Sequence, residues 1–167
     1  MGLVLGAALW CALAACAGNL VYRPEKTIAP VPVAEMATKS DLPPIPDQKA
    51  NDATLAGIDT TGIGVRDDVH IWIYSNYTTT VKRTILMTMA KAMRDVIVTA
   101  PRTAEEAKRL NQSSMEATMM LKLVRGLSRD EAEQMDELLF EQEFNTDERL
   151  DAYLRYNLLL GGGKATH

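Results

Sequence analysis

Apolar positions recur at helical spacing along much of the second half of the chain. From Thr80 to about Val98 they return every three or four residues, with basic side chains between them, which is typical of a helix that buries one face. Pro101 ends this segment, because proline lacks the amide donor that a helix interior needs. The apolar residues of this helix are Val81, Ile85, Met89, Met93 and Val96 or Ile97.

Three more helix starts carry capping signals. Thr103-Ala-Glu-Glu106 and Ser128-Arg-Asp-Glu131 both have the spacing of a capping box, and Asn145 or Thr146 precedes an acidic first turn. An apolar stripe follows each start, so the sequence predicts a mainly α-helical fold, a small bundle of three to four helices. The stripes contain Ala107, Leu110, Ser114, Ala117, Leu121 and Val124, then Ala132, Met135, Leu138 and Leu139, then Leu150, Tyr153, Leu154 and Leu158.

Residues 69–74 (VHIWIY) fit two structures. Their alternating β-branched and aromatic residues favour one short strand, which would pair with the preceding segment or with another chain. Apolar residues from Val69 to Ile97 also recur at every fourth position, so the same residues could be the first turn of one long helix. The pattern leaves both interpretations open.

Proline is concentrated ahead of the helical segments. Six of the seven prolines fall between Pro24 and Pro46, where each one biases the chain towards extended backbone. We therefore expect an extended or disordered tether over residues 16–66, a helical domain over 67–160 and a flexible tail over 161–167. A domain of this size has a small core, so we expect it to be more stable in a complex than alone.

The chain begins with an uncharged, mostly apolar run over residues 2–15. The run is shorter than the ~20 residues of a membrane-spanning helix, and it has the length of the apolar part of a signal peptide. It ends in Leu13-Ala14-Ala15-Cys16, which resembles the lipobox of bacterial lipoproteins. The resemblance implies a signal peptide over 1–15, cleavage before Cys16, diacylglycerol on its sulfur and acylation of the new amino terminus. Ala17 after the cysteine implies, by similarity to enteric lipoproteins, anchoring at the periplasmic side of the outer membrane.

The charge of the chain changes sign between its two helical halves. Residues 78–126 carry nine basic and four acidic residues, a net of +5, whereas residues 127–160 carry three basic and ten acidic residues, a net of −7. Either the acidic half folds back on the basic half, or one of them faces an oppositely charged partner. The net charge of −4 for the whole chain argues against nucleic acid as a partner.

The sequence offers little catalytic or metal-binding chemistry. Nucleophile-elbow, zinc-protease and phosphate-loop motifs are absent from it. Asp67, Asp68 and His70 would be weak metal ligands, and we expect them to form a solvated turn. The glutamates between Glu131 and Glu143 are expected to be a solvated helix face. We therefore expect a protein that is not an enzyme and has no cofactor apart from the lipid on Cys16.

Two apolar groups are candidates for binding a partner protein. One lies in the 69–74 segment, and the other, around residues 119–124, is apolar on more than one helical face and rich in adaptable methionine. The candidate partner-binding residues are Ile71, Trp72, Ile73, Met119 and Met120.

These features favour a non-catalytic structural subunit of a multiprotein cell-envelope assembly, such as a secretion or conjugation machine. Its expected partners are the membrane, through acylated Cys16, and other envelope proteins in a homo- or hetero-oligomer. The alternative is a periplasmic binding or inhibitory lipoprotein, acting as a chaperone, an exclusion factor or an enzyme inhibitor.

Overall fold

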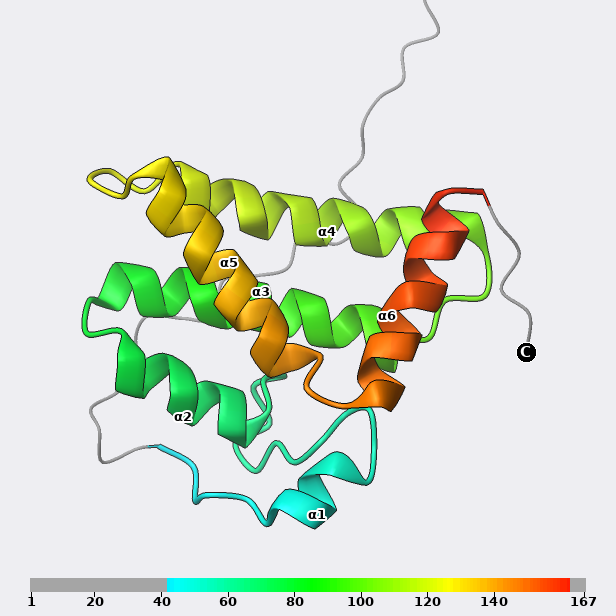
Figure 1. Cartoon of the computed structure of the whole chain (residues 1–167), viewed down its shortest axis with the longest axis horizontal. Helices are drawn as coiled ribbons and strands as arrows, with labels where there is room; N and C mark the ends of the chain where they lie inside the picture. The colour runs from blue at the N-terminus through cyan, green and yellow to red at the C-terminus, as the bar shows by residue number, and fades with distance from the viewer. Residues whose placement is uncertain (1–41, 163–167) are drawn as a thin grey trace, which may run out of the picture.

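The computed structural model describes residues 42–162, which fold into a bundle of helices with no strand among these residues. The antiparallel pair α3 and α4 forms one layer, α5 and α6 cross it, and α2 packs beside α3 and α5 (Figure 1). The mainly α-helical bundle predicted from the sequence is confirmed. The helices are α1 (Gln48–Asp52), α2 (Asp67–Asn76), α3 (Thr80–Val98), α4 (Ala104–Lys122), α5 (Arg129–Glu143) and α6 (Asp147–Leu160).

The predicted capping residues begin three of these helices. The side chain of Thr103 accepts a hydrogen bond from the amide of Glu106 at the start of α4. Ser128 and Glu131 form a complete capping box at the start of α5, in which each side chain bonds the backbone amide of the other residue. Thr146, rather than Asn145, caps α6. Local sequence therefore sets where these helices start.

Of the two interpretations of residues 69–74, the strand is wrong, because these residues lie inside α2. Helical spacing places Val69 and Ile73 on one face, and both are buried in the core, so tertiary packing overrides the strand preference of this segment. The helical interpretation is right for residues 69–74, but the helix does not continue unbroken into α3. Tyr77 has extended backbone and ends α2 before α3 begins.

Arg83, in the first turns of α3, links α3 to the end of α2. Its guanidinium group donates hydrogen bonds to the carbonyl oxygens of Tyr74 and Tyr77, at 2.9 and 2.5 Å, and lies 4.3 Å from the centre of the Tyr74 ring. The last carbonyls of a helix have no partner within the helix. Arg83 therefore stabilises the end of α2 as well as the angle between the two helices.

The bundle has two hydrophobic clusters. One lies between α2, α3, α4 and α5 and includes Ile73, Met89 and Leu139. The other joins α3 and α4 to α6 and includes Ile97 and Tyr156. Methionine fills positions in the first cluster, which agrees with its suitability for irregular cores. Among the helices of residues 42–162, none combines the length and the apolar character of a membrane-crossing helix.

Residues 42–66, here called the 42–66 segment, correct the expectation of a tether that continues to residue 66. This segment contains α1 and packs on the bundle, with Asn51, Val65 and Arg66 buried. Scattered apolar residues such as Val65 and Leu55 join the two hydrophobic clusters, and hydrogen bonds from buried polar side chains supply much of the remaining attachment, so the segment leaves no apolar stripe in the sequence. The rest of the predicted tether, residues 16–41, and most of the predicted tail lie outside the described residues.

Arg149 of α6 holds the middle of the 42–66 segment, at the end of α1 and just after it. Its fully buried guanidinium group donates to the carbonyl oxygens of Asn51, Thr54 and Leu55, at 2.6, 3.1 and 3.4 Å. It also forms a 3.1 Å ion pair with Asp52. One side chain thereby satisfies several backbone acceptors in a segment with little regular structure.

Arg66 holds the end of this segment. Its guanidinium group, also fully buried, donates to the carbonyl oxygens of Gln142 and Glu143 at the end of α5, at 2.7 and 2.9 Å. It pairs with Asp68 through two contacts of 3.0 Å. The two arginines therefore attach the 42–66 segment on either side of the α5–α6 connection.

Gly57 makes room for Arg66. It has a positive φ of 62°, and a Cβ atom at this position would lie 2.3 Å from Cδ of Arg66. We expect Gly57→Ala to lower the free energy of unfolding by about 2 to 4 kcal/mol, because it strains the backbone and displaces a buried ion pair. Urea unfolding followed by circular dichroism measures this loss.

Gly62 provides the matched control for this substitution. It has a similar φ of 68°, but a Cβ atom added there would have no neighbouring atom within 4 Å. Gly62→Ala should therefore cost only the backbone strain, about 1 to 2 kcal/mol. Equal losses in the two variants would contradict the role of Gly57 in placing Arg66.

Candidate functional site

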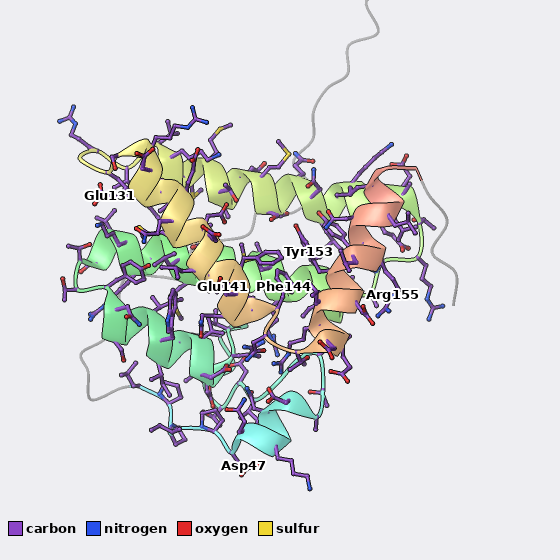
Figure 2. All side chains as sticks on the ribbon, in the orientation of Figure 1. Asp47, Glu131, Glu141, Phe144, Tyr153 and Arg155 are labelled. Atoms are coloured by element: carbon purple, nitrogen blue, oxygen red, sulfur yellow. The ribbon has the colours of Figure 1, made fainter. Side chains whose placement is uncertain are left out.

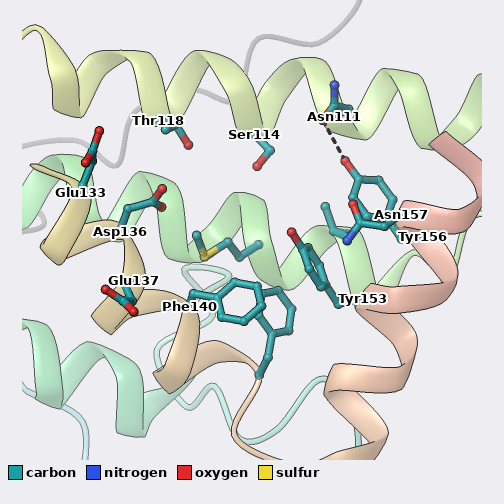
Figure 3. A pocket seen from close by; sticks show the side chains of 13 residues that line it. Asn111, Ser114, Thr118, Glu133, Asp136, Glu137, Phe140, Tyr153, Tyr156 and Asn157 are labelled. Carbon is teal, nitrogen blue, oxygen red and sulfur yellow. Dashed lines mark hydrogen bonds between the residues drawn. The ribbon is translucent and has the colours of Figure 1, made fainter. Parts of the chain in front are cut away.

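A cleft of about 390 Å³ opens between α4, α5 and α6, with side chains of α3 at its base (Figure 3). One face of α5 forms a wall of the cleft, because Glu133, Asp136, Glu137 and Phe140 recur at helical spacing. The lining residues are Met93, Val96, Asn111, Ser114, Thr118, Glu133, Asp136, Glu137, Phe140, Phe144, Tyr153, Tyr156 and Asn157.

Aromatic rings form the end of the cleft where α5 meets α6. Phe140 lies 4.6 Å from Phe144 and 5.0 Å from Tyr153, and Phe144 lies 4.5 Å from Tyr153, measured between ring centres. Figure 2 shows Phe144 and Tyr153 together between the two helices. Stacked and edge-on rings of this kind restrain one another. They form a firm apolar surface for a ligand to contact.

Polar groups of α4 and α6 lie beside the rings. The hydroxyl group of Tyr156 donates a 3.2 Å hydrogen bond to Oδ1 of Asn111, which joins α6 to α4. Burial raises the pKa of Tyr156 to about 12, so the hydroxyl keeps its proton and remains a donor. Ser114 and Thr118 point from α4 towards the cleft (Figure 3).

The other end of the cleft is acidic. Glu133 forms a 2.7 Å ion pair with Arg129, whose hydrogen bond lowers the pKa of Glu133. Asp136 is half-buried, and its burial raises its pKa despite the attraction of Lys122. No hydrogen bond or ion pair reaches the Asp136 carboxyl group from residues 42–162. The thirteen lining residues include three carboxyl groups and no lysine, arginine or histidine.

A second surface feature lies on the outer face of α6. Leu150, Leu154 and Leu158 recur at every fourth position and are 38%, 55% and 49% exposed. The core-facing side of α6 is formed instead by residues such as Ala152, Tyr156 and Leu159. We call these three exposed leucines the leucine stripe. Three exposed leucines in one row are surface that association with another protein can cover.

The chain matches no protein-family model, and no curated protein and no solved structure is similar enough to count as a match.

The partner-binding residues predicted from the sequence fall in different environments. Ile73 is fully buried in the core, so it is not available to a partner, and Ile71 and Trp72 are half-buried. Met119 and Met120 are exposed on α4, by 59% and 39%. Cys16 lies outside the described residues.

The acidic residues near the start of α2 are structural. Asp67, predicted in a solvated turn, is fully buried and accepts hydrogen bonds from the amide and hydroxyl groups of Thr60. His70 is also buried, with its ring 4.9 Å from that of Tyr74, and burial lowers its pKa. Within residues 42–162, no three His, Cys, Asp or Glu side chains come together as a metal-binding group.

The acidic half of the chain does pack on the basic half, since α5 and α6 contact α3 and α4. However, no ion pair in the described part of the chain joins a basic residue of 78–126 to an acidic residue of 127–160. Lys122 attracts Glu133 and Asp136 only at longer range. Within α5, Glu133 pairs with Arg129 and Glu143 is buried beside Arg66, whereas Asp136 and Glu137 form no ion pair with the described residues.

The sequence pattern does not reveal the cleft or the leucine stripe as sites. It groups Leu150, Leu154 and Leu158 with Tyr153 on one apolar face of the last helix. Their spacing of four residues is a detectable signal, because it separates them from a second row formed by Ala152, Tyr156 and Leu159. Glu143, expected on a solvated face, is fully buried.

Proposed function

We propose that this chain is a lipid-anchored, non-catalytic subunit of a multiprotein cell-envelope assembly, such as a secretion or conjugation machine. Cys16 attaches it to the periplasmic side of the outer membrane, and the helical domain binds neighbouring subunits. The lipobox resemblance supports the anchor. The leucine stripe on the outer face of α6 is the observation that carries the assembly role.

The leucine stripe has the form of a helix that docks into a groove. Such helices present apolar residues three or four positions apart to the partner. Full burial of a leucine side chain contributes about 1.5 to 3 kcal/mol, so three partly exposed leucines supply a substantial part of a binding energy. Their polar neighbours on α6, such as Asp151 and Arg155, are exposed and suit the rim of an interface.

A periplasmic binding or inhibitory lipoprotein is the second candidate function. The cleft between α4, α5 and α6 favours it, because a concave site with aromatic and polar lining is typical of ligand binding. The two candidates differ in stoichiometry. A subunit remains in a stable complex, whereas a binding protein associates only when its ligand is present.

The assembly role predicts that Leu154→Asp releases the protein from its complex. The full-length chain, expressed with its leader in its native host, is extracted from membranes in mild detergent and sized by native electrophoresis. The wild-type chain should migrate in a larger complex. Leu154→Asp should weaken the association by roughly tenfold to a hundredfold and shift the chain to the free form.

Val81→Asp is the matched control, because Val81 is a similarly exposed apolar residue on α3, outside the leucine stripe. This variant should stay in the complex. Cys16→Ser should prevent acylation, which mass spectrometry of the amino terminus detects. A wild-type chain that migrates only as a free monomer, or a Leu154→Asp chain that stays in the complex, would contradict the proposal.

A further inference from the structure

We propose that the cleft between α4, α5 and α6 binds a short segment of a partner protein in which a lysine or arginine stands beside an aromatic or aliphatic residue. This goes beyond the proposed assembly role. The cleft and the leucine stripe use different residues of α6, so each can function without the other.

The aromatic end of the cleft specifies the apolar part of this ligand. Phe140, Phe144 and Tyr153 lie within 5.0 Å of one another and present ring surface to the cleft. The volume of about 390 Å³ lies near the lower end of the ~300–1,000 Å³ range of ligand sites. It suits the side chains of a few residues rather than a folded domain.

The acidic end specifies a cation. Glu133, Asp136 and Glu137 lie on the cleft-facing side of α5, one to two helical turns before Phe140, and no basic residue lines the cleft. Asp136 carries a desolvation cost without a hydrogen bond or ion pair from residues 42–162. Glu133 already pairs with Arg129 at 2.7 Å, so a cation placed beside Asp136 and Glu137 would compensate that cost.

The arrangement of the carboxyl groups favours a basic side chain over a metal ion. They do not form a group that could hold a metal. A lysine or arginine side chain has a hydrocarbon stem that packs along apolar surface while its charged end remains in a polar environment. Its stem would lie against Phe140 with its charge at Asp136 and Glu137, and aromatic faces also attract such cations.

The α4 side of the cleft offers contacts for a peptide backbone. Ser114 and Thr118 are one helical turn apart, and both hydroxyl groups face the cleft (Figure 3). Hydroxyl groups donate and accept hydrogen bonds, so they can pair with either the amide or the carbonyl group of an extended segment. The side chains of the bound segment would thus contact α5, and its backbone would contact α4.

The test selects ligands without assuming their sequence. The full-length chain is reconstituted in phosphatidylcholine nanodiscs and panned against a phage-displayed library of random peptides, after removal of phage that bind empty nanodiscs. We expect enriched peptides to share a lysine or arginine next to an aromatic or aliphatic residue. The most enriched peptide is then labelled and titrated by fluorescence anisotropy.

Variants locate the binding site. The double variant Asp136→Asn, Glu137→Gln should bind the peptide at least about tenfold more weakly, and Ser114→Phe should abolish binding by filling the cleft. Glu141→Gln is the control: it removes one carboxylate from α5, where the double variant removes two, at an exposed position outside the cleft lining (Figure 2). It should change the affinity by less than about twofold. Circular dichroism verifies that each variant is folded.

Three results would overturn the proposal. The first is the absence of enrichment over empty nanodiscs. The second is enrichment of peptides without basic residues, or of basic peptides without an apolar neighbour, which indicates adsorption by charge alone. The third is an equal loss of affinity in Glu141→Gln and in the double variant. Release of the complex by Leu154→Asp is measured separately, so failure of this proposal leaves the assembly role to its own test.

Discussion

Replacement of Arg149 by alanine is expected to lower the free energy of unfolding by about 3 to 5 kcal/mol. The guanidinium group is fully buried, and its loss leaves the carbonyl oxygens of Asn51, Thr54 and Leu55 without their donor. Asp52 also loses its ion-pair partner. A buried acceptor that loses its donor still bears the full free-energy cost of being removed from water. This cost is larger than the net contribution of the hydrogen bond to stability.

Denaturant unfolding measures this loss, and hydrogen exchange locates it. Amide protons of the 42–66 segment should exchange faster in Arg149→Ala, while those of α3 and α4 are less affected. Arg155→Ala, an exposed arginine on the same helix, is the control and should change stability by less than about 0.5 kcal/mol. A loss in Arg149→Ala as small as that of the control would show that Arg149 does not hold the segment.

Between pH 4.5 and 7, the buried carboxyl group of Glu143 should cost the protein about 3 kcal/mol of stability. Burial raises the pKa of Glu143 to about 7 from an ordinary value of 4.5, and this effect outweighs the attraction of Arg66. Oε2 lies 3.8 Å from Arg66, and neither carboxylate oxygen accepts a hydrogen bond from the described residues. The folded state therefore favours the protonated form.

The direction of this pH dependence follows from the higher proton affinity of Glu143 in the folded state than in the unfolded state. The unfolded chain releases the Glu143 proton near pH 4.5, whereas the folded chain keeps it until about pH 7. Raising the pH through this interval therefore favours unfolding, and the loss is complete above pH 7. His70 acts in the opposite direction near its ordinary pKa of 6.5, because burial lowers its pKa in the folded state.

Glu143→Gln isolates the contribution of this carboxyl group. Glutamine has nearly the same shape and stays neutral, so the variant should lack the decline between pH 4.5 and 7 while His70 contributes equally in both proteins. Denaturant unfolding at several pH values gives the difference between the two curves. If the two stability curves run parallel, the Glu143 carboxyl group does not titrate as its burial implies.

Sequence patterns predict α3 to α6 because their signals are local. A capping residue fixes the start of each of α4, α5 and α6, and an apolar stripe identifies a buried face. The 69–74 segment stays ambiguous in the sequence because a short run of β-branched and aromatic residues fits both a strand and a helix. Only the burial of Val69 and Ile73 in one core distinguishes the two.

The 42–66 segment and the cleft could not be predicted in this way. The segment is attached by arginines that are 77 and 98 positions away from some of their partners, and such pairs leave no periodic signal. The cleft depends on how α5 and α6 lie across α3 and α4, an arrangement that brings Phe140 and Tyr153 together. The sequence alone does not distinguish the glutamates of α5 that face the cleft from those exposed elsewhere. It also does not distinguish buried Glu143 from exposed Glu141.

The attachment of the 42–66 segment also sets the path of mechanical force through the molecule. With the chain held at Cys16, as proposed, tension would reach the described part of the chain from its N-terminal side, through the 42–66 segment. Arg66 and Arg149 pass the tension to the end of α5 and the first turn of α6. Phe144 lies between these two points in the chain and is one of the rings at the aromatic end of the cleft. In the proposed anchored assembly, a pull on the anchor would therefore be delivered to α5 and α6, the two helices that shape the cleft, and would bear on the segment proposed to bind there.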